Sequence, residues 1–302
     1  MPSGGYSLKS AKQGFHHKHS LGQNFIEDEA LLEELARLSL VTQEDCVLEI
    51  GPGFGALTKP LARRARQVLA LEIDRALLPI LQVTLESFGN VQVLQGDVMK
   101  TDLAALVKQA FGEDCPLRVA ANLPYYITTD VISRLILELP QARSIAVMIQ
   151  KEVGDKLLSA PGEEGYGPLA ILCQYTCEVQ RALDVPAACF NPPPKVDSSF
   201  MVLTRRREPL APVADEALFF RLVKAAFAMR RKTMTNNLAT GFALDRAQAA
   251  ALLEETGWSA QSRAEALSIG QLCALSNQLY RLLHGDSASS LAHQAESAHE
   301  IN

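Results

Sequence analysis

One short segment of this sequence can hold and orient a flat aromatic amine. Asn122-Leu123-Pro124-Tyr125 follows the apolar run 118–121, so an amide, two backbone carbonyls and an aromatic ring meet where a strand is expected to end. The amide and carbonyl oxygens can accept hydrogen bonds from an amino group, and the ring can stack on a base. The alternative is a simple turn, which Pro124 would favour.

A glycine-rich segment upstream suits the nucleoside end of a cofactor. Glu49-Ile50-Gly51-Pro52-Gly53-Phe54-Gly55 lies between an apolar run and an amphipathic one, as a strand-to-helix turn does. Polar residues also close the next predicted strands. We expect Glu72 to bind ribose hydroxyls, Asp97 to accept from the adenine amino group of the cofactor, and Asn122 to close the fourth strand. Each alone is typical of a helix cap, but their succession favours a site.

Together these segments predict methyl transfer from S-adenosylmethionine to the exocyclic amine of an adenine. The lone pair of that amine is delocalised into the ring, and acceptors aimed at its two hydrogens favour a pyramidal nitrogen that can attack. Asn122, with the carbonyl of Leu123 or Pro124, can supply them, while Tyr125 stacks on the ring. Positioning provides most of the rate in such a transfer, so we expect no strong general base.

A proline-rich segment offers a second aromatic face. Phe190 precedes Asn191-Pro192-Pro193-Pro194-Lys195-Val196-Asp197-Ser198, which the prolines stiffen. We expect Phe190 and Tyr125 to sandwich the base, which requires an unpaired or flipped nucleotide.

The elements that must position these residues alternate between strands and helices. Strands are predicted at 46–50, 68–73, 91–95, 118–121, 145–150, 179–185 and 200–205, and helices at 29–39, 56–66, 75–87, 103–111, 130–138 and 151–159. This alternation predicts an α/β fold, a Rossmann-like S-adenosylmethionine-dependent methyltransferase sheet. Because only residues 186–199 join the last two strands, we expect the last strand to be antiparallel.

Beyond the boundary marked by Pro209 and Pro212 the sequence predicts a small all-α domain. Helices are predicted at 216–229, 232–239, 246–256 and 269–283, the last capped by Ser268 and buried through Leu272, Leu275, Leu279 and Leu282. The predicted organisation is a flexible basic arm (1–20), a methyltransferase domain (21–208), a helical RNA-binding domain (209–284) and a disordered tail (285–302).

Composition and charge indicate the compartment and the partner. The 302 residues are 48% hydrophobic and 21% charged, with no bilayer-spanning run and no secretory leader in the first 20, which predicts a cytoplasmic protein without a membrane partner. We interpret the six cysteines as small buried hydrophobes and predict no metal site, since Cys173 and Cys177 alone cannot bind zinc.

A basic cluster argues for a nucleic-acid partner despite the net charge of −5. Residues 200–235 hold eight bases against three acids. The residues predicted to bind RNA are Arg221, Lys224, Arg230, Arg231 and Lys232. A solvated charged surface is the alternative.

These motifs resemble those of the KsgA/RsmA family of ribosomal RNA adenine dimethyltransferases from about residue 18 to about residue 277. The resemblance rests on Leu21-Gly22-Gln23-Asn24-Phe25-Ile26, the glycine turn, Asn122–Tyr125, the proline segment and Arg230-Arg231-Lys232-Thr233. It implies a monomer that dimethylates two adjacent adenosines in a hairpin near the 3′ end of 16S ribosomal RNA, in the immature small subunit. It also implies that Asn24, Ile26, Gly51, Glu72, Asp97 and Asn122 bind the cofactor.

Two rival functions remain open from the sequence. One is a 23S ribosomal RNA adenine methyltransferase of the antibiotic-resistance type, which the proline segment and helical domain disfavour. The other is a non-catalytic RNA-binding assembly or transcription factor, against which Gly51, Glu72, Asp97 and Asn122 argue.

Overall fold

The computed structural model describes residues 23–285, which form two compact units. Within this range the first unit comprises residues 23–155 and Cys177–Arg205, and the second comprises Lys156–Thr176 and residues 206–285. The predicted arm (1–20) and all of the predicted tail except Gly285 lie outside the described residues. No helix of residues 23–285 is long and apolar enough to cross a membrane.

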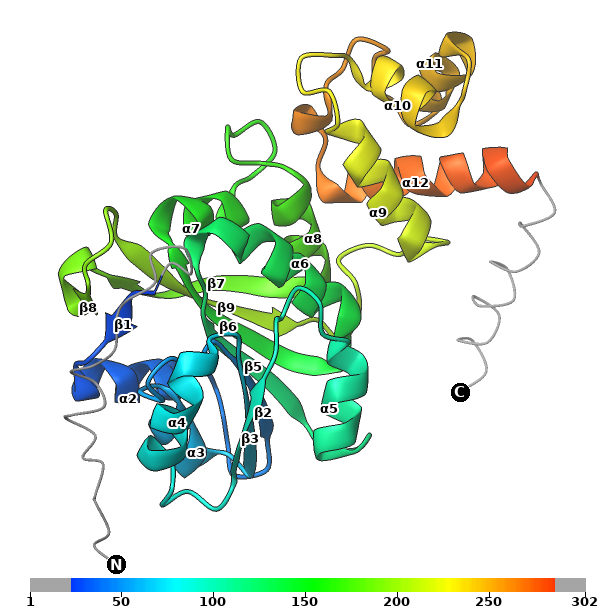
Figure 1. Cartoon of the computed structure of the whole chain (residues 1–302). Helices are drawn as coiled ribbons and strands as arrows, with labels where there is room; N and C mark the ends of the chain where they lie inside the picture. The colour runs from blue at the N-terminus through cyan, green and yellow to red at the C-terminus, as the bar shows by residue number, and fades with distance from the viewer. Residues whose placement is uncertain (1–22, 286–302) are drawn as a thin grey trace, which may run out of the picture. The chain divides into compact units, whose positions relative to one another are not determined.

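The first unit is built on a seven-stranded sheet with the spatial order β4-β3-β2-β5-β6-β9-β7 (Figure 1). Its strands are β2 (Cys46–Ile50), β3 (Gln67–Glu72), β4 (Val91–Gln95), β5 (Leu117–Asn122), β6 (Ala142–Gln150), β7 (Cys177–Val185) and β9 (Ser198–Arg205). The first five are parallel to one another. All seven strands were predicted from the sequence, and the Rossmann-like class is confirmed.

Strand β9 lies between β6 and β7 and is antiparallel to both. A parallel connection needs a crossover of a dozen or more residues, usually a helix, and the stiff segment before β9 contains no long helix. The prediction of an antiparallel last strand is therefore confirmed.

Helices flank both sides of this sheet, as Figure 1 shows. They are α2 (Glu29–Leu38), α3 (Thr58–Arg64), α4 (Leu78–Thr84), α5 (Leu103–Phe111), α6 (Thr128–Glu138) and α7 (Lys151–Leu158). All five residues of β2 are buried, as expected for a parallel strand covered on both faces. One face packs on α2 and α3 through Leu35, Leu61 and Val47.

A separate two-stranded ladder joins the start of the described chain to the proline segment. β1 (Phe25–Ile26) pairs antiparallel with β8 (Phe190–Asn191), and Ile26 lies opposite Phe190. The sequence did not predict this ladder, because two residues are too few to show a periodicity.

The second unit is helical, with α8 (Pro168–Thr176), α9 (Glu216–Ala226), α10 (Met234–Phe242), α11 (Arg246–Glu255) and α12 (Ile269–His284). It also takes in residues 156–176, which the sequence interpretation assigned to the methyltransferase domain. Residues 156–176 belong to this unit because two of their tyrosines contact other residues of it. Tyr166 donates to the carbonyl of Leu267 at 3.0 Å, and the rings of Tyr175 and Phe219 lie 4.6 Å apart.

Local predictions in this unit need two corrections. Ser268 caps α12 as predicted, and Leu272, Leu275 and Leu279 are buried, but Leu282 is 45% exposed because it lies in the last turn of the helix. Helix α10 begins at Met234 after the cap Thr233, so the bases 230–232 lie in the preceding loop, not in the helix.

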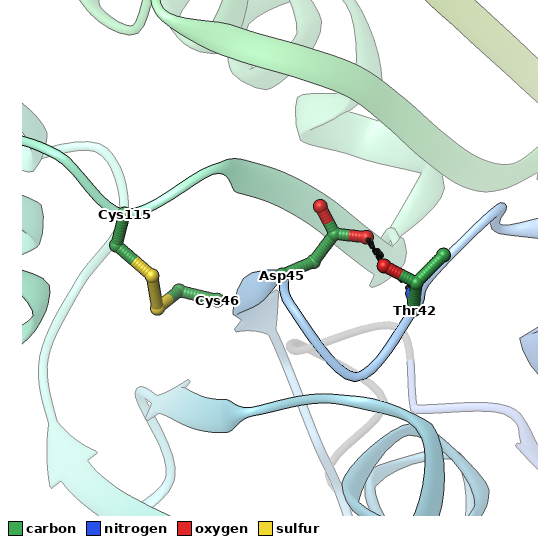
Figure 2. Close-up of a disulfide and its surroundings, with 4 residues drawn as sticks. All are labelled: Thr42, Asp45, Cys46 and Cys115. Atoms are coloured by element: carbon green, nitrogen blue, oxygen red, sulfur yellow. Dashed lines mark hydrogen bonds between the residues drawn. A yellow bond between two sulfur atoms is a disulfide. The ribbon is translucent and has the colours of Figure 1, made fainter.

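The structure also corrects the interpretation of two cysteines. A disulfide joins Cys46, at the start of β2, to Cys115, just before β5 (Figure 2). Beside it the Asp45 carboxylate accepts from Thr42 and from the guanidinium of Arg118, at 2.9 and 2.7 Å. Cys173, Cys177 and Cys273 are buried, as predicted.

Candidate active site

The carboxyl ends of β2, β3 and β5 border one cavity of about 70 Å³ in the first unit. Parallel strands place their carboxyl ends on one edge, where ligands of open α/β sheets bind. The residues that line the cavity are Gln23, Asn24, Gly51, Gly53, Glu72, Ile73, Leu77, Asn122, Leu123, Pro124, Tyr125 and Phe190. Predicted cofactor residues and predicted base-binding residues thus share one space.

The glycine turn brings backbone, not side chains, to the cavity. Gly51 and Gly53 have φ of +69° and +60°, a region that disfavours other residues. A Cβ on Gly53 would lie 2.6 Å from the ring of Phe25, which itself packs 4.4 Å from the ring of Phe54. A side chain at position 53 would therefore have to displace the Phe25 ring of β1.

Glu72 is held in place by the turn that it faces. Its carboxylate accepts from the backbone N–H of Gly53 at 3.1 Å and of Asp74 at 2.8 Å. Burial raises the pKa of Glu72, while these two hydrogen bonds oppose that rise. Each carboxylate oxygen keeps a further lone pair with which it can accept from a hydroxyl.

A second acid, Glu49, is buried behind the turn. It is 2% exposed, and its Oε2 atom has no hydrogen-bond partner among the described residues. Burial raises the pKa of Glu49 to about 8, and the nearby Glu72 adds to the rise. Glu49 therefore holds a proton near neutral pH. No role was predicted for Glu49, since burial of a strand residue is a tertiary property.

Asn122 is oriented by the segment that leads into β1. Its Nδ2 donates to the carbonyl of Asn24 at 3.0 Å. This bond fixes the orientation of the amide, whose Oδ1 can accept from an amino group. Leu123 and Pro124 also line the cavity. The Pro124 carbonyl accepts from the backbone N–H of Ile127 at 3.3 Å and from the Thr128 hydroxyl at 3.2 Å.

Tyr125 and Phe190 supply the two aromatic side chains of the cavity lining. The hydroxyl of Tyr125 is 2.9 Å from the hydroxyl of Ser198, and Phe190 is held in β8 by its pairing with Ile26. Burial raises the pKa of Tyr125, so its phenol stays neutral at physiological pH. Sequence reasoning missed the part of Ser198 in fixing this ring.

Two predicted cofactor residues do not line this cavity. Ile26 is 5% exposed and packs in the core beside α2. Asp97 follows β4 and accepts from the backbone N–H of Met99 at 2.9 Å. Gln23 does line it and donates to Asp74 at 3.0 Å, although it was not among the predicted cofactor residues. Its position next to Asn24 was the available signal.

The five predicted RNA-binding bases belong to the second unit, and all are exposed. Arg221 lies over the ring of Phe242 at 4.6 Å, and Arg230 donates to the carbonyl of Glu164 at 3.1 Å. These two side chains therefore have structural partners as well as solvent exposure.

The sheet order and the cavity define a class of protein, the S-adenosylmethionine-dependent methyltransferases. A cradle with no room for a side chain at Gly53, beside a buried acid that can still accept hydrogen bonds, fits a nucleoside carrying ribose hydroxyls. When bound, this cofactor supplies an electrophilic methyl group.

Comparison with known proteins narrows the class to a family. The family model for ribosomal RNA adenine dimethylase matches residues 14–280. The small-subunit ribosomal RNA methyltransferases A of Bacillus cereus (strain B4264) and Bacillus anthracis (strain A0248) are each 45% identical over 271 residues, which is 89% of this chain and 93% of theirs. The chain belongs to the ribosomal RNA adenine dimethylase family.

Solved structures agree on the fold. A dimethyladenosine transferase from Plasmodium falciparum is 23% identical with a TM-score of 0.69, covering 83% of this chain and 95% of its own. The 23S ribosomal RNA methyltransferase ErmE is 26% identical with a TM-score of 0.64, covering 85% and 100%. The predicted enzyme class and cofactor are confirmed: this is an S-adenosylmethionine-dependent ribosomal RNA adenine dimethyltransferase.

Proposed function

We propose that this enzyme dimethylates the 6-amino groups of two adjacent adenosines in a hairpin loop near the 3′ end of 16S ribosomal RNA, in the immature small subunit. The observation that carries the proposal is the shared cavity, in which the Asn122 amide, with Nδ2 bound to Asn24, lies beside Tyr125 and Phe190. The choice of the small subunit is supported by the 45% identity to methyltransferases named for it.

Within this proposal the residues have distinct roles. Asn24, Gly51 and Glu72 hold the cofactor from the cavity side, with Ile26 supporting them through β1 and Asp97 accepting from the adenine of the cofactor. The target adenine lies between Tyr125 and Phe190. Asn122 and the carbonyl of Leu123 or Pro124 accept from its amine, and the proton that each methylation releases leaves to solvent.

The RNA itself is held by charge. We assign phosphate contacts to Arg221, Lys224, Arg230, Arg231 and Lys232, which are exposed and therefore available to a polyanion. The proposal further takes the enzyme to be a monomer in the cytoplasm, which size-exclusion chromatography and cell fractionation would check.

The direct test maps methylated adenosines in RNA from cells with and without this protein. The proposal expects the two adjacent 16S adenosines to lose their methyl groups in the deletion strain and to regain them when the gene is restored. Loss of an adenosine methylation from 23S RNA instead would identify the enzyme as a 23S methyltransferase. ErmE, a 23S ribosomal RNA methyltransferase, shares the fold of this chain.

The non-catalytic rival is separated by binding. Calorimetric titration with S-adenosylmethionine should give saturable binding of one molecule per chain, and Glu72→Ala should weaken it. A wild-type protein that binds no cofactor would support the assembly-factor function.

A further inference from the structure

Tyr126 is an exposed aromatic side chain immediately after the residues that line the cavity. It exposes 60% of its surface, the most of the exposed large hydrophobic side chains of residues 23–285. It lies in the 3₁₀ turn η3 (Tyr125–Ile127). Since such a turn has three residues per revolution, adjacent side chains diverge, so Tyr126 points elsewhere when Tyr125 faces the cavity.

The turn that carries Tyr126 is fixed against the end of the proline segment. The hydrogen bond from Tyr125 to Ser198 connects the two, and Asp197 is held in turn by the backbone N–H groups of Ala187 and Lys151, at 2.9 and 3.0 Å. Val196 in this segment is 45% exposed, and Lys195 beside it is exposed as well. Tyr126, Val196 and Lys195 thus each lie within three residues of the Tyr125–Ser198 hydrogen bond.

We propose that Tyr126 stacks on the base adjacent to the adenosine that occupies the cavity. This inference rests on the proposed function. Extruding one base from its neighbours leaves the face of the next base uncovered, and an exposed ring outside the cavity can replace the lost stacking partner. Stacking is tolerant of sequence because every base has a π-face. Tyr126 can therefore serve each of two adjacent adenosines while the other is in the cavity.

The test uses the full chain and a small-subunit particle assembled from unmethylated 16S RNA and its ribosomal proteins. Steady-state kcat/KM for the particle is measured for the wild type, Tyr126→Ala, Tyr126→Leu and Tyr126→Phe, and mass spectrometry counts the methyl groups on each adenosine. Removing an aromatic stacking partner weakens binding about 5- to 150-fold. We expect a loss of this size in kcat/KM for the Ala and Leu variants and a near-normal kcat/KM for the Phe variant. Particles methylated on only one adenosine should accumulate with the Ala and Leu variants.

Controls separate this role from a structural one. The dissociation constant for S-adenosylmethionine and the melting temperature should stay unchanged in all three variants, and Leu137→Ala, at another exposed apolar residue of the same unit, should behave as wild type. Wild-type kcat/KM in Tyr126→Ala, or Tyr126→Leu matching Tyr126→Phe, would overturn the stacking role. Failure of the wild-type enzyme to methylate the particle would overturn the proposed function and this inference with it.

Discussion

At the scale of single residues, the cavity is organised by side chains that are already engaged within the protein. Asn122 uses its Nδ2 on Asn24, Glu72 uses both oxygens on backbone N–H groups, and Tyr125 uses its hydroxyl on Ser198. Groups fixed in this way lose little freedom when substrate binds, which is how positioning accelerates a reaction between two bound molecules. Substitutions should therefore affect turnover more than folding.

Asn122→Ala should lower the rate of methyl transfer by on the order of 10²-fold, as the loss of one preorganised polar contact to the reacting group does in other enzymes. Affinity for the ribosomal particle should stay close to that of the wild type, because the proposed phosphate contacts are made by other residues. Single-turnover methyl incorporation and particle binding measure the two quantities. A rate near that of the wild type would remove Asn122 from the reaction.

Glu49 should make folding stability depend on pH. Its pKa is about 8 in the folded protein against an ordinary value of 4.5, so the folded state binds the proton more tightly and stability falls as pH rises from about 4.5 to about 8. Glu49→Gln cannot lose a proton. The melting temperature of this variant should therefore rise relative to wild type between pH 5 and pH 8. If the melting temperatures of the two proteins change in parallel across that pH range, Glu49 is not the titrating group.

Most of the cavity could be predicted from the sequence because its residues close successive strands. Gly51, Glu72 and Asn122 each follow an apolar run, and parallel strands bring such ends together. Gln23 and Ser198 were missed because they act on other side chains of the protein. Only their three-dimensional neighbours, Asp74 and Tyr125, reveal what they do.

At the scale of elements, the fit between the glycine turn and β1 decides whether the cavity can form. The seven strands of the sheet were predictable, since most contain an apolar run or alternate apolar with polar residues. The β1–β8 ladder and helix α8 were not. The ladder is too short to show a pattern, and residues 168–176 are apolar almost throughout, so they show no amphipathic period.

Gly53→Ala should disturb this fit. The added methyl group would lie 2.6 Å from the Phe25 ring, and alanine would also be strained at a φ of +60°. We expect weaker S-adenosylmethionine binding and a lower melting temperature. Gly89→Ala is the matched control, because its Cβ would meet nothing within 4 Å. Equal cofactor affinity in the two variants would show that β1 can move aside without weakening cofactor binding.

At the scale of the whole molecule, chemistry and RNA affinity are assigned to different compact units. The cavity belongs to the first unit and the exposed bases belong to the second. The Cys46–Cys115 disulfide lies within the first unit. Such bridges are uncommon in cytosolic proteins, so the composition gave no reason to expect it, and spacing alone does not reveal which cysteines pair.

Replacing Arg230, Arg231 and Lys232 with glutamine should weaken particle binding and leave the cofactor dissociation constant unchanged. Three phosphate contacts contribute a slope of about −2 to −3 in the logarithm of affinity against the logarithm of salt concentration. We therefore expect a shallower salt dependence in the variant. Because Arg230 also donates to Glu164, an early melting transition with an unchanged salt slope would instead indicate a structural cluster.

The small ladder between β1 and β8 has a consequence for local unfolding. Only two residue pairs hold it, whereas five pairs join β2 to β5. Segments with few contacts open with the smallest free energy, so one wall of the cavity is expected to unfold locally while the sheet stays intact. Amide hydrogen exchange should therefore be faster at Phe25 and Ile26 than at Val47 and Leu48, and bound cofactor should slow the first pair selectively.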